Sequence, residues 1–390
     1  MAFAWILVIL GSARRASAYP WMISKGYTAC AQCHADPSGA GLLTAYGRAQ
    51  SALLLSSFDA PGAAEEGEPS SISKQLFGAI PDGDWLLVGG WIRNGYLWNY
   101  SRGELVDHRF LQMRADLGAQ VRVDKLRASA TVGYQRSESA TFAQRAWVTG
   151  ASEAGNVVSR EHWVGVDVSD SILVRAGRLA LPFGLRNIEH TTFVRTATRT
   201  DINQAQQHGV ALAFNDDAWR AEGMAILGNF QVHPDAFRER GYAAYVERAF
   251  GTHVAIGVSS LVTRAAADID SSRRTVRQAH GAFARIGVSE RVAALAEADV
   301  LVAAIENAPN TVGYTGLLQL DGEVTRGVHL IGTGEALRRG VTGETPTWGA
   351  WASAAWFIVP HLDVRVDYLY RTSLDAPATS TVLFQGHLYL

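Results

Sequence analysis

The chain has 390 residues, 48% of them hydrophobic, and its 35 Lys and Arg residues nearly balance 37 Asp and Glu residues, for a formal net charge of −2. This balance lacks the basic excess that nucleic-acid binding requires, so we expect no nucleic acid as a partner. No stretch approaches the roughly 18 consecutive apolar residues of a transmembrane helix, so we expect no membrane-spanning helix.

Residues 1–18 have the pattern of a secretory signal peptide. An apolar run of about ten residues is followed by Ala16-Ser17-Ala18, which matches an Ala-x-Ala cleavage site. Two features are irregular, because no Lys or Arg precedes the apolar run and Arg14 and Arg15 stand close to the cleavage site. We predict export, with Tyr19 as the first residue of the mature chain.

The only two cysteines lie in the string Cys30-Ala31-Gln32-Cys33-His34. This is the attachment pattern of a c-type haem, in which two thiols add to the porphyrin vinyl groups and the adjacent imidazole binds iron. We therefore predict one covalent haem c, with Cys30 and Cys33 as attachment points and His34 as the proximal iron ligand. The alternatives are a disulfide in an exported protein or half of a metal site, although no further zinc ligands follow at close spacing.

Composition divides the rest of the chain into three predicted parts. Residues 19–56 hold the haem motif, and at about forty residues they are too few for a substantial core, so we expect the covalent haem to support their fold. Residues 57–83, with Pro61, Gly62 and the acidic Glu65 and Glu66, are predicted to form a flexible acidic linker. This linker is long enough to let the haem segment plug a lumen. Residues 84–390 are predicted to form successive strands joined by polar turns and a few longer loops.

Polar and apolar residues alternate strictly in the strand region, which places them on opposite faces of a sheet. In 111–124 one face carries Gln112, Arg114, Asp116, Gln120, Arg122 and Asp124, and the other carries Leu111, Met113, Ala115, Leu117, Ala119, Val121 and Val123. In 361–371, His361, Asp363, Arg365, Asp367 and Arg371 oppose Leu362, Val364, Val366, Tyr368 and Tyr370. The pattern fits either a soluble sandwich with an apolar core or a transmembrane barrel with a charged lumen.

Three observations favour the barrel. The strands are near the 9–11 residues that cross a membrane, and their polar face is densely charged. Aromatic residues fall near strand ends, as the girdles of such barrels require; they are Trp85, Trp91, Trp98, Trp147, Trp163, Trp219, Trp348, Trp356, Tyr368 and Tyr370. An amphipathic strand runs to Leu390. We predict an all-β fold, a transmembrane antiparallel barrel of about sixteen strands, including neighbouring strands near 311–320 and 322–335. The regions 140–158 and 336–347 are predicted to include extracellular loops.

The longest irregular stretch between predicted strands, 179–205, contains Pro182-Phe183-Gly184 and several charged residues, among them Arg186, Arg195 and Arg199. A loop of this length is functional or disordered. Folded into the lumen, its arginines would form a constriction that attracts anions. The alternative is an exposed loop with balanced charge.

The second ligand of the iron has several candidates. Met22 lies close to the motif, and Met ligation would raise the reduction potential relative to two histidines. The alternative for Met22 is a hydrophobic contact beside Pro20 and Trp21. Strand alternation adds further lumen-facing candidates, which are His253, His329, His361, His387 and Met224.

The haem motif together with the barrel pattern resembles the fused monohaem cytochrome–porins of the Gram-negative outer membrane. The likeness rests on 26–34, on Pro37-Ser38-Gly39 and on Tyr46-Gly47-Arg48. Separately, 177–184 resembles a strand-end pattern of phosphate-selective-type porins. The resemblance implies an outer-membrane protein, similar to those that oxidise ferrous iron at the cell surface, although iron oxidation itself does not follow from the motif.

Three functions remain open from the sequence. The first is an electron-transfer conduit between an extracellular donor or acceptor, such as iron, and a periplasmic c-type cytochrome or other carrier, embedded in outer-membrane lipid. The second is a passive anion or solute porin whose haem segment serves for docking. The third is an oxidoreductase with an open iron position, for which no nucleophile–base constellation stands out.

Overall fold

The computed structural model describes residues 19–37, 39, 41–58, 74–81, 83, 85–135, 156–187, 189, 191–340 and 344–390. The predicted signal peptide, most of the predicted linker and Trp147 lie outside the described residues. Among the described residues, none of the helices combines the length and the hydropathy needed to cross a membrane.

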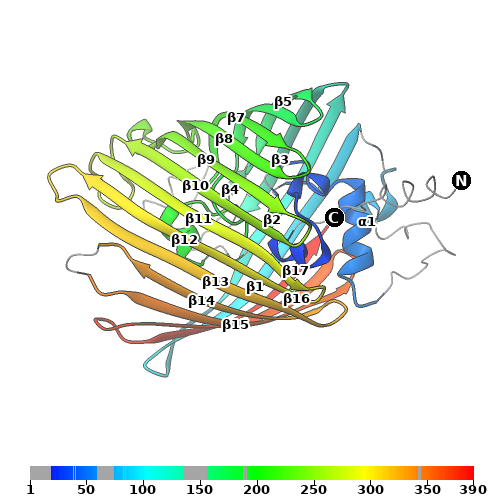
Figure 1. Cartoon of the computed structure of the whole chain (residues 1–390). Helices are drawn as coiled ribbons and strands as arrows, with labels where there is room; N and C mark the ends of the chain where they lie inside the picture. The colour runs from blue at the N-terminus through cyan, green and yellow to red at the C-terminus, as the bar shows by residue number, and fades with distance from the viewer. Residues whose placement is uncertain are drawn as a thin grey trace, which may run out of the picture.

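Seventeen strands form a single antiparallel sheet (Figure 1). They are β1 (Leu86–Ser101), β2 (Glu104–Val123), β3 (Leu126–Gln135), β4 (Asn156–Val158), β5 (His162–Ser169), β6 (Ile172–Leu179), β7 (Gln207–Asn215), β8 (Trp219–Gly228), β9 (Arg240–Phe250), β10 (Val254–Ala265), β11 (Thr275–Ser289), β12 (Val292–Ile305), β13 (Thr311–Thr325), β14 (Val328–Arg338), β15 (Thr347–Val359), β16 (Leu362–Ser373) and β17 (Thr379–Tyr389). The helical elements are the 3₁₀ turns η1 (Pro20–Lys25), η2 (Cys30–Gln32), η4 (Gln75–Gly78) and η5 (Asp235–Phe237), and the α-helices α1 (Ala45–Leu54) and α3 (Phe193–Thr198).

The sheet closes into a barrel because β1 pairs with both β2 and β17. Strands β4 and β5 both pair with β3, so they are two parts of one interrupted strand, and the seventeen strands fill sixteen positions in the wall. The predicted all-β antiparallel barrel of about sixteen strands is confirmed. The predicted strand break between 320 and 322 is wrong, because β13 continues to Thr325 and Asp321, which resembled a turn residue, is a buried strand residue.

The alternation of the sequence decides which side chains face out. In β2, Asp116 and Gln120 are buried whereas Leu117 and Val121 are exposed. In β16, Arg365 and Asp367 are buried whereas Val366 is exposed. A water-soluble sandwich would bury the apolar set, so this arrangement is that of a barrel with an apolar outer surface and a polar lumen. It confirms the predicted location in the outer membrane of a Gram-negative bacterium.

The aromatic residues divide between the two faces. Trp219, Trp348 and Trp356 are exposed on the outside, as a membrane girdle requires. Trp163 is buried, and its ring lies beneath the guanidinium of Arg175. The girdle prediction is therefore wrong for Trp163. Alternate residues of β5 face the lumen, and Trp163 is one of them.

The two ends of the barrel differ in their connections. One end carries only short turns, at 124–125, 170–171, 216–218, 251–253, 290–291, 326–327 and 360–361. The longer connections lie at the other end, including 229–239 and 266–274. Outer-membrane barrels have short turns on the periplasmic side and long loops outside, so we assign the short-turn end to the periplasm.

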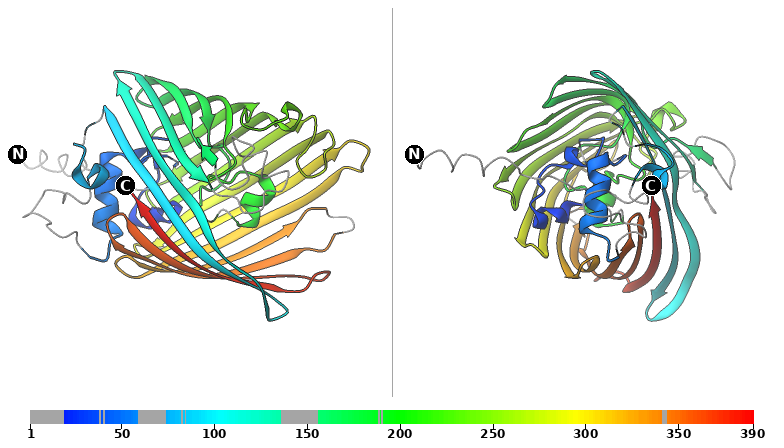
Figure 2. Two further views of the ribbon diagram at one scale, coloured as in Figure 1. Left: turned by 180° about the vertical axis from the view of Figure 1, so that it is seen from behind. Right: turned by 90° about the vertical axis from the view of Figure 1, so that its right-hand side faces the viewer.

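Residues 19–58, here called the N-terminal segment, lie inside the periplasmic end of the barrel (Figure 2, right). The segment contacts strands around the whole wall. The contacts are Asp36 with Arg175 of β6, Cys30 with Arg220 of β8, Thr28 with Arg285 of β11, Lys25 with Glu323 of β13, Ser57 with Phe357 of β15, and Ser51 with Tyr389 of β17.

Residues 180–206, here called the inner loop, connect β6 to β7 and also fold into the lumen. Figure 1 shows its helix α3 within the ring of strands. Phe183 and Val194 are buried, and the loop packs against β12, β13 and β14. Of the two alternatives for this region, the structure has the lumenal one; Ile188 and His190 lie outside the described residues.

Candidate haem-attachment site in the barrel lumen

The Cys-x-x-Cys-His motif forms a tight turn held by backbone hydrogen bonds. The amides of Cys33 and His34 both donate to the carbonyl oxygen of Cys30, at 3.1 and 3.0 Å. Thr44, the N-cap of α1, then ties the turn to the helix, because its amide donates to the carbonyl of Cys33 at 2.8 Å and its hydroxyl donates to the carbonyl of Gln32. The motif and the start of α1 are therefore joined by hydrogen bonds of both the backbone and the side chain of Thr44.

Two glycines allow the close packing around the cysteines. A Cβ on Gly47 would lie 2.4 Å from the carbonyl oxygen of Cys33, so only glycine lets α1 approach the motif this closely. Gly39 has a φ of +92°, and a Cβ there would lie 3.1 Å from the sulfur of Cys30. Both glycines therefore let the neighbouring backbone pack tightly against the motif.

The two cysteines are not joined to each other. Cys33 is buried, and the sulfur of Cys30 lies 2.7 Å from Nη1 of Arg220. Covalent haem attachment needs both thiols, and haem attachment at Cys30 and Cys33 stays a prediction.

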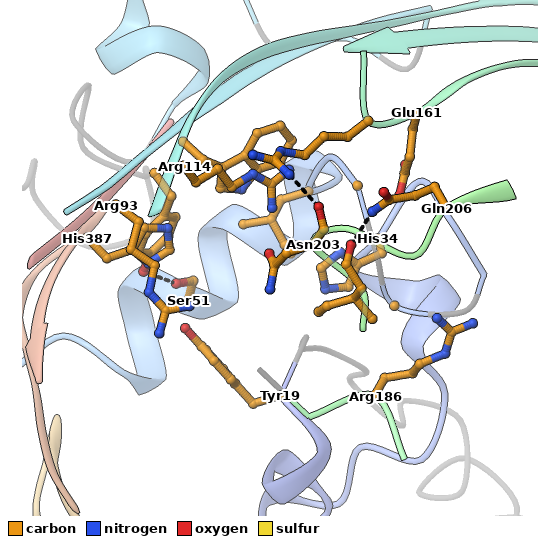
Figure 3. Close-up of a pocket in the computed structure, with 18 of the residues that line it drawn as sticks. Tyr19, His34, Ser51, Arg93, Arg114, Glu161, Arg186, Asn203, Gln206 and His387 are labelled. Atoms are coloured by element: carbon orange, nitrogen blue, oxygen red, sulfur yellow. Dashed lines mark hydrogen bonds between the residues drawn. The ribbon is translucent and has the colours of Figure 1, made fainter. Parts of the chain in front are cut away.

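A cavity opens beside His34, between the N-terminal segment and the inner loop (Figure 3). Three parts of the chain line it. The N-terminal segment contributes Tyr19, His34, Gly39, Gly41, Leu43, Gly47, Ser51 and Leu55; the inner loop contributes Arg186, Ile202, Asn203 and Gln206; and the wall contributes Trp91, Arg93, Arg114, Arg160, Glu161, His387 and Tyr389.

The cavity wall carries an excess of positive charge. Arg114 and Arg160 share the carboxylate of Asp116, with distances of 2.6 and 2.7 Å to the same oxygen. Arg93 donates to the neutral side chain of Gln385. The three guanidinium nitrogens of Arg186 are buried and donate no hydrogen bond to any of the described residues.

Arg186 lies within Coulombic range of Glu161 and Glu222 but donates no hydrogen bond to either, so its donors are available to an anionic group. A haem carries two propionate carboxylates, and Arg186 and Arg93, which Figure 3 shows on different sides of the cavity, are cationic lining residues that suit such groups. His34 and Arg186 line the cavity and suit an iron ligand and a propionate partner, whereas Cys30 and Cys33 are not among its lining residues, although Gly39, which packs against the sulfur of Cys30, is.

Met22, like Cys33, is packed away from the cavity, whereas His34 lines it. Met22 is completely buried in an apolar cluster with Trp21, Ile23 and Cys33, and it is not among the residues that line the cavity. This is the hydrophobic-contact alternative for Met22, and ligation by Met22 stays a prediction. The sequence analysis placed Arg114 on the lumen face but did not link it to the motif. Alternation shows which face of a strand a residue occupies, but not its position along the barrel axis.

The other arginines of the inner loop are neutralised by the wall. Arg195 forms a buried ion pair with Glu297, whose other oxygen accepts the amide of Leu185 at 2.8 Å. Glu189 pairs with Arg365 at 2.6 Å; burial opposes ionisation, but Arg365 outweighs it and lowers the pKa of Glu189. The predicted anion-attracting constriction is therefore limited to Arg186.

Arg199 anchors the far end of α3 to two extracellular connections. It contacts Glu239 at 2.7 Å, Asp268 at 2.8 Å and Asp270 at 2.6 Å. Burial raises the pKa of Glu239, but Arg277 and Arg199 together lower it to about 2. The inner loop is thus fixed by ion pairs at both ends of its helix.

Comparison with known proteins identifies the architecture. No family model matches the chain, and no curated protein matches it in sequence. Among solved structures, outer-membrane-expressed OmpT of Vibrio cholerae superposes with a TM-score of 0.60 at 13% identity, covering 80% of this chain and 100% of that one. An anion-selective porin from Comamonas acidovorans has a TM-score of 0.56 at 10% identity, covering 78% and 99%. The channel DcaP of Acinetobacter baumannii has a TM-score of 0.53 at 11% identity, covering 78% and 97%. The fold is that of an outer-membrane porin-type barrel.

Proposed function

We propose that this chain is an outer-membrane electron-transfer protein that holds one covalent c-type haem inside a porin-type barrel. Cys30 and Cys33 would form the two thioether bonds, and His34 would bind the iron. When bound, the haem would supply a one-electron redox centre. The observation that carries the proposal is the placement of this motif inside the lumen, beside a cavity whose Arg186 donates no hydrogen bond to any of the described residues.

In this proposal, three parts of the chain position, cover and orient the haem. The N-terminal segment fixes the position of the motif through its contacts around the wall, including the ion pair between Asp36 and Arg175 at 2.8 Å. The inner loop covers the opposite side of the cavity and restricts access of water. Arg186 and Arg93 would bind the propionates and thereby orient the porphyrin within the lumen.

The position of the motif along the barrel axis suggests which electron-transfer partners can reach it. The motif lies in the periplasmic half of the barrel, where a periplasmic c-type cytochrome or another carrier can approach. The other partner would be an extracellular donor or acceptor, with ferrous iron as one candidate, reached through the outer half of the lumen. On this basis the protein exchanges electrons across the outer membrane without releasing a soluble product.

Liposomes that enclose oxidised horse-heart cytochrome c test this proposal. With ascorbate outside, wild-type protein should reduce the enclosed cytochrome, whereas a Cys30→Ser/Cys33→Ser variant should not. Retention of an enclosed dye must be equal in both preparations, which controls for leakage. Equal reduction rates for the two proteins would contradict the proposal.

The alternative is a passive anion or solute porin whose N-terminal segment serves as a docking element. The observation that favours it is the cationic wall formed by Arg93, Arg114 and Arg186. Planar-bilayer recordings separate the two functions, because a lumen filled by residues 19–58 should conduct ions poorly until that segment is deleted. Large porin-like conductance in the full chain, unchanged by the deletion, would favour the passive porin.

A further inference from the structure

The cavity beside His34 has a second imidazole on its wall. His387, from β17, lines the same cavity, and Figure 3 shows it on a different side of the cavity from His34. Among the residues that line the cavity, these two are the only histidines, and none is a methionine or a cysteine. The hydroxyl of Tyr389, another possible iron ligand, is already hydrogen-bonded to Ser51 at 2.9 Å.

Asp363 fixes the orientation and the tautomer of the His387 ring. The two residues lie directly opposite each other in the pairing of β16 and β17, and Nδ1 of His387 lies 3.0 Å from a carboxylate oxygen of Asp363. A carboxylate at Nδ1 accepts a hydrogen bond from the ring N–H there. The lone pair of the neutral ring is then on Nε2, where it can bind a metal. Histidines that bind metals are commonly oriented in this way by a second residue.

A second His–Asp pair in the lumen provides a comparison. Nδ1 of His329 lies 2.8 Å from Asp321. However, the ring of His329 packs against that of Trp21, with 4.4 Å between the ring centroids, and His329 is not among the residues that line the cavity. The His–Asp pairing therefore occurs twice, and only at His387 does it face the cavity beside the haem motif.

We propose that His387 is the second axial ligand of the iron and that Asp363 is the residue that positions it. This inference rests on the proposed function, because it requires the haem held by Cys30, Cys33 and His34. It replaces Met22, which would have to leave its packed cluster to reach the cavity. Ligation by two imidazoles gives a lower reduction potential than ligation by His and Met.

Spectroscopy of the purified full chain tests this assignment. Near-infrared magnetic circular dichroism of the ferric wild type should show low-spin iron with two imidazole ligands. In His387→Ala the low-spin signal should be lost and the ferrous form should gain carbon monoxide binding. His387→Met should restore low-spin iron at a higher potential. Asp363→Asn should retain low-spin iron with a shifted potential, as expected for a positioning residue.

Two matched variants serve as controls. Met22→Leu and His329→Ala should leave the wild-type spectrum and potential unchanged. A wild-type spectrum of His–Met type, loss of low-spin iron in Met22→Leu, or an unaltered spectrum in His387→Ala would overturn the assignment. If a substitution in β17 prevents assembly of the barrel, a wild-type spectrum of His–Met type would still overturn the assignment, as would loss of low-spin iron in His329→Ala.

The pyridine haemochrome assay separates this inference from the proposed function. Wild-type protein without a c-type haem would overturn both together. One haem per chain combined with an unaltered His387→Ala spectrum would overturn only the axial assignment and would leave the electron-transfer function standing.

Discussion

Arg186 is the residue whose charge most directly links the cavity to an anionic ligand. Its guanidinium is buried beside His34, and no hydrogen-bond partner for it exists among the described residues. A buried guanidinium whose donors make no hydrogen bond is costly, even with Glu161 and Glu222 within Coulombic range. If the proposed haem is bound, the same charge would hold a propionate and would stabilise the reduced state of the iron.

We therefore expect Arg186→Gln to lower the reduction potential. A shift of about 59 mV corresponds to a tenfold change in the equilibrium of a one-electron couple, and a change of that order is expected for loss of a buried cation. Arg186→Lys, which keeps the charge, should remain close to the wild type. Spectroelectrochemical titration measures both, and identical potentials in all three proteins would contradict a role for Arg186 at the haem.

Gly47 controls the distance between α1 and the motif. In Gly47→Ala the new Cβ would meet the carbonyl of Cys33 at 2.4 Å and push the helix away. Overpacking of this kind typically costs about 1–3 kcal/mol, so the haem content per folded barrel should fall. Gly223→Ala, where a Cβ meets nothing within 4 Å, is the control. Equal haem content in both variants would show that the close packing is not needed.

At the scale of elements, the inner loop depends on a buried carboxylate. Glu297 accepts from both Arg195 and the amide of Leu185. Glu297→Gln leaves the guanidinium without its counter-charge, and breaking a buried pair typically costs about 3–5 kcal/mol. Hydrogen exchange of 180–206 should then accelerate strongly. The exposed Glu306→Gln should leave it unchanged, and equal exchange in the two variants would contradict the anchoring role.

The ion pairs at the other end of α3 predict how the loop responds to acid. The pKa of Glu239 is about 2 in the folded protein, below the ordinary value of about 4.3. A lowered pKa contributes stability that is present above the ordinary value and is lost as pH falls through the folded value. Exchange protection of the inner loop should therefore hold to about pH 4 and decline between pH 4 and 2. In Glu239→Gln the protection should show no such decline.

The strands could be predicted from the sequence because each has two faces in different solvents. The alternation of 111–124 and 361–371 gave the barrel, its membrane location and the lumen-facing residues such as Arg114 and His387. The boundary near residue 321 could not be predicted in this way. Asp321 and Gly322 resemble a turn by composition, and only pairing with β14 shows that they continue the strand.

The position of the inner loop and the residues that line the cavity could not be predicted from the sequence. Whether 179–205 lay inside or outside depended on long-range partners such as Glu297 and Arg365, which no local pattern connects to the loop. Met22 illustrates the same limit, because closeness in sequence suggested a ligand whereas packing places it in an apolar cluster. His387 is separated from the motif by most of the chain, and closure of the barrel brings both to one cavity.

At the scale of the whole molecule, the barrel is filled from both directions along its axis. The N-terminal segment occupies the periplasmic end and the inner loop occupies the lumen beyond it, so the site lies between them. If the proposed haem is bound there, the wall would act as an insulating layer around a redox group rather than as the wall of an open channel.

The most direct measurement is the pyridine haemochrome of barrel purified from cells that mature c-type cytochromes. We predict one haem c per chain, which resists extraction by acidified acetone because it is covalent, and which is missing from Cys30→Ser/Cys33→Ser. A folded wild-type barrel with no haem, or with Cys30 and Cys33 joined in a disulfide, would contradict the account.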